Sequence, residues 1–134
     1  MGFRLVSRAV LCTAVAASST LLFTGVASAA TSTTINGATA VGGGGATVSV
    51  TYSCDPSSDA RRLTAVIEDK TSGGLGAGFV EPTCNSQSHT VSVPVRPSAG
   101  AFNHGDTAKI ATDLVDGLGD SVPGAGRFGT VTLG

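Results

Sequence analysis

The segment ATVSVTYSC, residues 46–54, alternates between apolar and small polar side chains along its whole length. Its second face carries only threonine and serine. A period of two is typical of a strand with one buried face, because successive side chains of a strand point to opposite sides. The segment therefore predicts a half-buried strand that ends where Asp-Pro-Ser-Ser begins. Its apolar face would consist of Ala46, Val48, Val50, Tyr52 and Cys54.

Similar segments recur along the chain, separated by glycine, proline, serine and aspartate. A weaker edge strand is expected around Thr33 and Ile35, and Gly42–Gly45 predicts a turn or a flexible tether. Short, regularly spaced strands without a convincing helix predict an all-β fold, an immunoglobulin-like sandwich of six to seven antiparallel strands over residues 46–134. Residues 30–45 would form a flexible N-terminal segment. The expected inward faces are Leu63, Ala65 and Ile67; Leu75, Ala77 and Phe79; His89, Val91, Val93 and Val95; Ala108, Ile110, Thr112 and Leu114; and Val131 and Leu133.

The first residues have the pattern of a secretory signal peptide. Arg4 and Arg8 form a basic start, an apolar stretch follows, and small residues stand at 27–29. We predict cleavage after Ala29, with Ala30 as the alternative. A membrane anchor is disfavoured, because serine and threonine interrupt an apolar run that is short for a membrane span. The predicted location is extracellular, with no membrane attachment after cleavage.

Charge and composition exclude several classes of partner. All nine acidic residues follow the predicted leader, so the remaining chain is acidic, and Arg61–Arg62 is its only basic doublet. Nucleic acid and anionic membranes are therefore poor candidates. The absence of tryptophan and the single tyrosine disfavour carbohydrate binding, which needs exposed rings. We expect a monomer that requires no cofactor.

Two cysteines, Cys54 and Cys84, remain once the leader with Cys12 is removed. An even number in an exported chain predicts a disulfide. A metal site would need His89 and His104 in addition, but the spacings of such sites are absent. A catalytic thiol would leave the other cysteine without a role. In an immunoglobulin-like sandwich, the strand ending at Cys54 would pair with the strand that follows Cys84. The bridge would then join neighbouring strands at one pole.

Other residues with chemical potential have more ordinary interpretations. His89 is either a ligand or base or, as we favour, a strand-end residue packed against Tyr52. His104 and Asp106 could orient a base, but no nucleophile motif such as G-x-S-x-G is present. Glu68 and Asp69 are adjacent, so on a strand they would point to opposite faces and could not act as a carboxylate pair.

A cluster of aspartates occupies the segment DLVDGLGD. Its members, Asp113, Asp116 and Asp120, could hold Ca²⁺ in the 116–127 loop, but the calcium-loop pattern is not met. Ordinary turn chemistry is the preferred interpretation. No catalytic, cofactor-binding or metal-binding residue is therefore predicted. The glycines of GGLGAGF predict a bulged or edge strand rather than a nucleotide site.

Two resemblances rest on particular residues. GDTAKIAT, residues 105–112, resembles the start of the sixth strand of immunoglobulin variable domains at Asp106 and Ala108, with Ile110 and Thr112 where those domains have tyrosine and cysteine. The chain as a whole resembles a family of small secreted actinobacterial proteins of unknown function. The shared motifs are TYSC, TCNSQSHTVSV and GAFNHGDTA, spread over residues 46–115. This resemblance implies a sandwich and export, and no known activity.

These observations favour a secreted, non-enzymatic domain that binds a protein or cell-surface partner through its loops or an edge strand. One alternative is a small-molecule carrier similar to the chromoproteins of the neocarzinostatin type, although those have two disulfides. The other is a secreted protease inhibitor, for which RRL at 61–63 would be the reactive segment. The loops expected to matter are the Asp55–Asp59 turn, residues 73–78 and residues 116–127.

Overall fold

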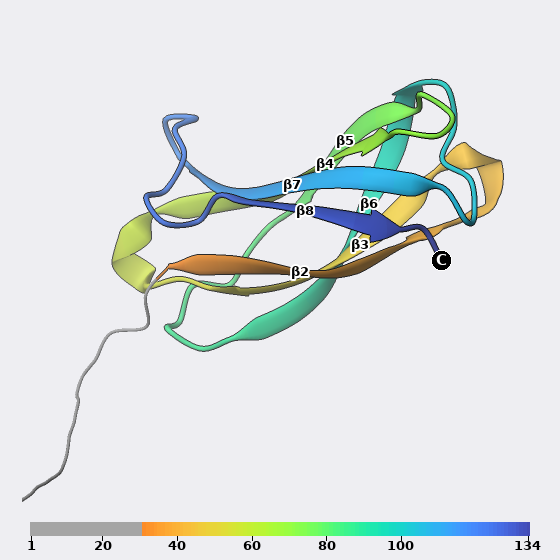
Figure 1. The fold of residues 1–134 in the computed structure, drawn as a ribbon. Helices are drawn as coiled ribbons and strands as arrows, with labels where there is room; N and C mark the ends of the chain where they lie inside the picture. The colour runs from red at the N-terminus through yellow and green to blue at the C-terminus, as the bar shows by residue number, and fades with distance from the viewer. Residues whose placement is uncertain (1–30) are drawn as a thin grey trace, which may run out of the picture.

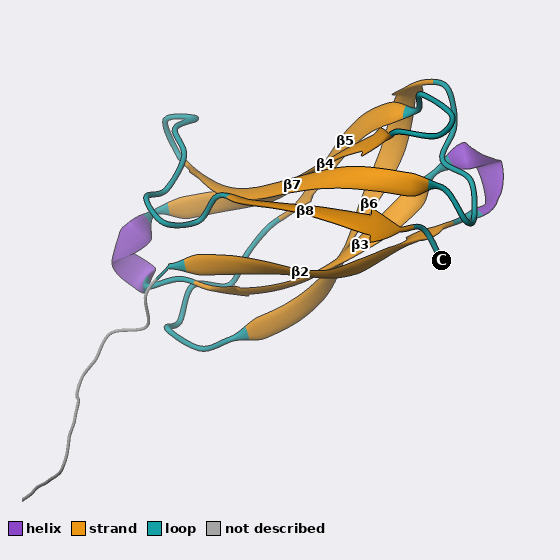
Figure 2. Cartoon of the chain, in the orientation of Figure 1, coloured by secondary structure: helices purple, strands orange, loops and turns teal. Residues whose placement is uncertain are grey.

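The computed structural model describes residues 31–134, so the predicted cleavage after Ala29 or Ala30 lies outside the described residues. This part of the chain is all-β, as predicted, and every strand pair is antiparallel (Figures 1 and 2). Two short 3-10 turns, Gly42–Gly44 and Pro56–Ser58, are the only helical pieces among the described residues. The strands are β2 (Ser32–Ala40), β3 (Ala46–Ser53), β4 (Ala60–Asp69), β5 (Leu75–Val80), β6 (His89–Ala99), β7 (Thr107–Asp116) and β8 (Arg127–Thr132).

All seven strands belong to one sheet in the order β2-β3-β6-β5-β4-β7-β8. The sheet turns at β6, which pairs with β3 through His89–Val95 and with β5 through Arg96–Ala99. Its two edges then approach each other, so that β2 lies near β8 (Figure 1). Arg127 Nε donates to the carbonyl of Thr33 at 3.1 Å, and Gly134 N donates to the carbonyl of Ala38 at 3.0 Å. The sheet is therefore nearly closed around one core.

The core lies inside the curved sheet and consists of the inward residues of its strands. The inward faces expected for β3, β4 and β7 are all buried, and Val93 and Val95 of β6 are buried as well. Phe102, the largest fully buried side chain, comes from the β6–β7 loop and not from a strand. Alternation alone therefore predicted most of the core but not its largest member.

The inward face predicted for β5 is wrong. Leu75, Ala77 and Phe79 point outward, and the glycines between them face the core. A Cβ atom on Gly76 or Gly78 would collide with the backbone carbonyl of β6 that lies over it. This face of β5 therefore approaches a neighbouring backbone closely, as only glycine allows. The predicted bulge is present, at Leu75/Gly76, but β5 lies between two strands and is not an edge.

The predicted first strand is present and is longer than expected. β2 pairs with β3 from Ser32 to Ala40, with a bulge between Ile35 and Gly37, so the sheet begins at Ser32 rather than at Ala46. The Thr33 hydroxyl group is fully buried in contact with Thr112 Oγ1 at 2.9 Å, and it donates to the carbonyl of Ala125 at 2.6 Å. These bonds attach the edge strand to β7 and to the loop before β8.

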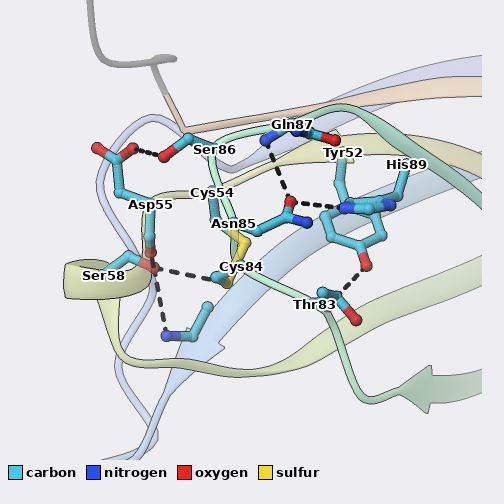
Figure 3. The surroundings of a disulfide bond; sticks show 11 residues. Tyr52, Cys54, Asp55, Ser58, Thr83, Cys84, Asn85, Ser86, Gln87 and His89 are labelled. Carbon is cyan, nitrogen blue, oxygen red and sulfur yellow. Dashed lines mark hydrogen bonds between the residues drawn. A yellow bond between two sulfur atoms is a disulfide. The ribbon is translucent and has the colours of Figure 1, made fainter.

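Cys54 and Cys84 form a disulfide, as predicted (Figure 3). The last pair of the β3–β6 ladder is Tyr52 with His89. Cys54 directly follows β3, and Cys84 shortly precedes β6, so the two cysteines lie at the same end of this ladder. The bridge joins two hydrogen-bonded neighbours at one pole of the sheet, which confirms the expected placement. Ser86 N also donates to the carbonyl of Cys54 at 2.9 Å.

Candidate binding face

His89 is part of the structure around the disulfide, as the preferred interpretation held. Its ring lies 5.5 Å from that of Tyr52, and Nε2 is 2.8 Å from the side-chain oxygen of Asn85 (Figure 3). The Tyr52 hydroxyl accepts a hydrogen bond from Thr83 N at 2.8 Å. These contacts order the chain on both sides of Cys84 and leave His89 with a structural role.

His104 and Asp106 lie in the β6–β7 loop, but Asp106 interacts with Asp69 and not with the histidine. The expectation that Glu68 and Asp69 point to opposite faces is confirmed, since Glu68 is exposed and Asp69 is buried. The sequence contained no sign that Asp69 would meet Asp106, because one ends β4 and the other lies in the β6–β7 loop, far away in the chain.

Asp113 and Asp116 of the 113–120 segment bind neighbouring backbone groups, and the contacts of Asp116 are turn contacts. Asp116 Oδ1 accepts hydrogen bonds from the backbone N–H groups of Leu118 and Asp120, each at 2.9 Å, and Asp113 Oδ1 accepts one from Leu114 N. Across residues 31–134, no three His, Cys, Asp or Glu side chains are grouped so that they could hold a metal ion. The preferred interpretation as turn chemistry agrees with these contacts.

The two outer faces of the sheet differ sharply in chemistry. The outward residues of β2, β3 and the first part of β6 are almost all small and polar. On β4, β5, β7 and β8, in contrast, several outward residues are apolar, and Phe128 and Phe79 are 85% and 58% exposed. The polar set is Thr34, Asn36, Thr47, Ser49, Thr51, Thr90 and Ser92, and the apolar set is Val66, Leu75, Ala77, Phe79, Ala111 and Phe128.

We call the second set the apolar face. Its central row is defined by strand register, in which Phe128 pairs with Ala111, Ala111 with Val66, Val66 with Ala77, and Ala77 with Arg96. The row thus crosses the four strands of the apolar face and ends at Arg96 on β6, about 19 Å from Phe128 at the usual strand spacing. Phe79 and Leu75 lie on either side of it. Exposed apolar surface that is contiguous in this way is characteristic of interaction sites, whereas scattered exposed residues are not.

Three cations surround the apolar face. Arg62 lies over the Phe79 ring at 5.5 Å, Arg96 ends the central row, and Lys109 is outward on β7. None of the three forms an ion pair within residues 31–134, where the ion pairs are Arg61–Asp59 and Lys70–Glu68. Positive charge on this face is therefore available to a partner, although the chain as a whole is acidic. One exposed carboxylate, Glu68, lines the same groove as Lys109 and forms its ion pair with Lys70.

Two shallow grooves run over the apolar face and meet at Val66. One, of about 450 Å³, extends between Leu75 and Phe128, and the other, of about 710 Å³, between Phe79 and Arg96. Their volumes fall within the usual range of small-ligand sites. Residues of the apolar face contribute to both linings, and Val66 belongs to both, so the grooves are features of the same surface.

No family model matches the chain, and no curated protein is significantly similar to it. Among the described residues, no helix has the length and apolar character needed to cross a membrane.

Sequence reasoning missed this face, although part of its signal was present. Phe128 shares the outward phase of Thr130 and Thr132, and Val66 shares that of Thr64, so both were apolar residues at positions expected to be polar. On β5 the phase itself was assigned wrongly, which placed Leu75 and Phe79 in the core. Only the strand order shows that these residues are neighbours.

Proposed function

We propose that this protein is a secreted, non-enzymatic binding domain, and that the apolar face is its docking surface for a protein partner. The observation that carries the proposal is the contrast between the two outer faces of one sheet. A face with no partner is expected to be polar, as the β2–β3–β6 face is, because an antiparallel sheet normally alternates between buried apolar and solvated polar residues.

The composition of the face supports a protein partner. Aromatic residues and arginine are enriched at protein interfaces, and the face presents Phe79 and Phe128 with Arg62 and Arg96 around them. The unpaired cations favour a partner whose apolar contact surface is bordered by carboxylates. Such complementarity would mainly increase the rate of association and the choice of partner. Export is supported by the leader pattern and by the disulfide.

The partner should be sought in the extracellular medium of the source organism, with matched variants as bait. Phe79→Ser with Phe128→Ser removes both exposed rings, whereas Ser49→Ala with Thr90→Ala alters the opposite face. A partner of the proposed kind is retained by the wild type and by the Ser49/Thr90 variant. The Phe79/Phe128 variant should bind it at least tenfold more weakly, and Arg96→Gln should reduce its salt-sensitive association rate. Equal retention by all variants would contradict the proposed docking surface.

A small-molecule carrier is the second candidate, and the grooves that meet at Val66 are the observation in its favour. Native mass spectrometry of protein from culture medium would separate the two functions. An added mass that is lost in the Phe79/Phe128 variant would favour the carrier. The protease-inhibitor alternative has no such support. It needs a reactive segment on an exposed loop, whereas Arg61 and Arg62 lie within β4, at a bulge in its pairing with β7.

A further inference from the structure

Two carboxyl groups, those of Asp69 and Asp106, meet where β4 ends and the β6–β7 loop leads into β7. Asp69 is the last residue of β4 and is 1% exposed. Its Oδ1 accepts hydrogen bonds from the backbone N–H groups of Thr71 and Ser72, each at 2.9 Å. Asp106 comes from the β6–β7 loop, two residues before Ala108, which pairs with Asp69 in the β4–β7 ladder. This register brings the Asp106 side chain to that of Asp69, and the two carboxyl groups hydrogen-bond each other.

Each carboxyl group has one buried oxygen that lacks a donor. Within residues 31–134, Oδ2 of Asp69 and Oδ2 of Asp106 are both shielded from solvent and have no hydrogen-bond partner. Unsatisfied buried oxygens are costly, and two carboxylates sharing a site repel each other. A single proton between the two groups removes both costs, because it neutralises one charge and supplies the missing donor.

The surrounding contacts join the β4–β5 turn to the β6–β7 loop. Ser72 Oγ donates to the carbonyl of Ala101 at 2.8 Å, and Lys70 N donates to that of Thr107 at 2.8 Å. Phe102, which follows Ala101, is buried in the core. The position of this loop therefore determines whether the largest side chain of the core stays in place.

We propose that Asp69 and Asp106 share one proton, and that this proton acts as a pH-dependent latch between the β4–β5 turn and the β6–β7 loop. A bridging cation is the less favoured occupant, because the described residues provide no third His, Cys, Asp or Glu ligand there. Loss of the proton leaves the buried carboxylate of Asp69 in contact with the partly buried carboxylate of Asp106, which weakens the contacts that hold the loop and Phe102.

The pKa shifts of the two groups agree with this arrangement. The hydrogen bond with Asp69 raises the pKa of Asp106, and burial and the negative charge of Asp69 act in the same direction. Hydrogen bonds from the side chains of Ser72 and Asn103 act against this rise and do not cancel it. Burial would raise the pKa of Asp69, but hydrogen bonds from Ser72 N, Asp106 and Thr71 N outweigh it and lower the pKa. The pair therefore favours a state with one proton, held mainly on Asp106.

Other charged groups at this end of the sheet face away from the pair or have other partners. Lys70, next to Asp69, forms its ion pair with Glu68 at 3.2 Å. His104 is exposed in the β6–β7 loop, and Lys109 is outward on β7. Residues 128–134, in β8 and beyond it, contribute no charged side chain. Among the described residues, the titratable groups of the latch are therefore the two carboxyl groups themselves.

The direction of the pH effect follows from the two shifts. The raised pKa of Asp106 contributes stability that is complete below the pKa of the unfolded chain and is lost as pH rises through the folded value. The lowered pKa of Asp69 contributes stability above its unfolded pKa that is lost as pH falls through the folded value. The latch is closed between these limits and opens on the alkaline side, above the raised pKa of Asp106.

The test is the pH dependence of the melting temperature over roughly pH 3–9, for the wild type and for Asp106→Asn. Asparagine keeps a hydrogen-bond donor toward Asp69 at every pH. We expect the wild-type melting temperature to fall by several degrees as pH rises through the pKa of the pair, and the Asp106→Asn curve to lack this fall. Asp113→Asn, in which a carboxylate on β7 away from the pair is neutralised, should retain it. A fall of the same size in Asp106→Asn would overturn the proposal.

Two further measurements on the wild type do not depend on the stability of any variant. Carbon-detected NMR titration of the carboxyl groups should show Asp69 and Asp106 titrating as a coupled pair, with one value raised. Two independent titrations at ordinary values would overturn the shared proton. A melting temperature that rises on addition of CaCl₂ in the wild type, and not in Asp106→Asn, would overturn it in favour of a bridging cation.

Discussion

Reduction of the Cys54–Cys84 bridge should cost this domain a large part of its stability. The two cysteines are 30 residues apart in the chain. In the chain-entropy model, closing a loop of that size removes disorder from the unfolded chain worth about 3.7 kcal/mol at 25 °C. For a domain of this size, that corresponds to a fall in melting temperature of roughly 15–30 °C.

Several contacts around the bridge would remain in the folded state after reduction. Tyr52 remains paired with His89, and the bonds from Ser86 N to Cys54 and from Thr83 N to Tyr52 do not depend on the disulfide. The reduced protein should therefore retain its fold under mild conditions. The predicted loss then reflects the greater freedom of the unfolded chain more than damage to the native state.

The assay is urea unfolding of the wild type with and without reductant, followed by far-ultraviolet circular dichroism. Cys54→Ala with Cys84→Ala is the control, because reductant should leave its unfolding curve unchanged. A difference below about 1 kcal/mol between oxidised and reduced wild type would refute the loop-entropy reasoning. An effect of reductant on the double variant would show that the measured difference has another origin.

Three further predictions concern the core and the apolar face. Gly78→Ala should destabilise the domain by about 1–3 kcal/mol in urea unfolding because its methyl group meets the β6 backbone, whereas Gly126→Ala meets nothing and should be neutral. Thr33→Val should cost about 1–3 kcal/mol in the same assay, because it leaves two buried partners unsatisfied, while Thr34→Val on the exposed side should cost little. Phe128→Ser should change stability by less than about 0.5 kcal/mol, since the ring is exposed, and yet weaken partner binding in a titration.

The apolar face and the carboxyl latch lie in different parts of the molecule and support separate conclusions. The face involves outward residues of four neighbouring strands. The latch joins the β4–β5 turn to the β6–β7 loop, which carries the buried Phe102. A failure of one proposal would therefore leave the other standing. Both differ from the original expectation that the loops at 55–59, 73–78 and 116–127 carry the function.

The sequence by itself determined the features that depend on local periodicity and on chain connectivity. The alternation of residues 46–54 predicted the central strand and its buried face, and the parity of the two remaining cysteines predicted their bridge. The inward faces of β4 and β7 followed from the same alternation. In each case the signal is contained in a few consecutive residues, or in a count that does not depend on the fold.

Tertiary structure decided what depends on which strands become neighbours. Leu75 and Phe79 were expected in the core because they are the apolar residues of β5. Alternation by itself does not show whether the apolar residues or the glycines between them face inward. The close approach of the β6 backbone selects the glycine phase. Asp69 and Asp106 are far apart in sequence, and only the packing of a turn against a loop brings their carboxyl groups together. The apolar face and the latch both arise from such long-range contacts, which no local pattern encodes.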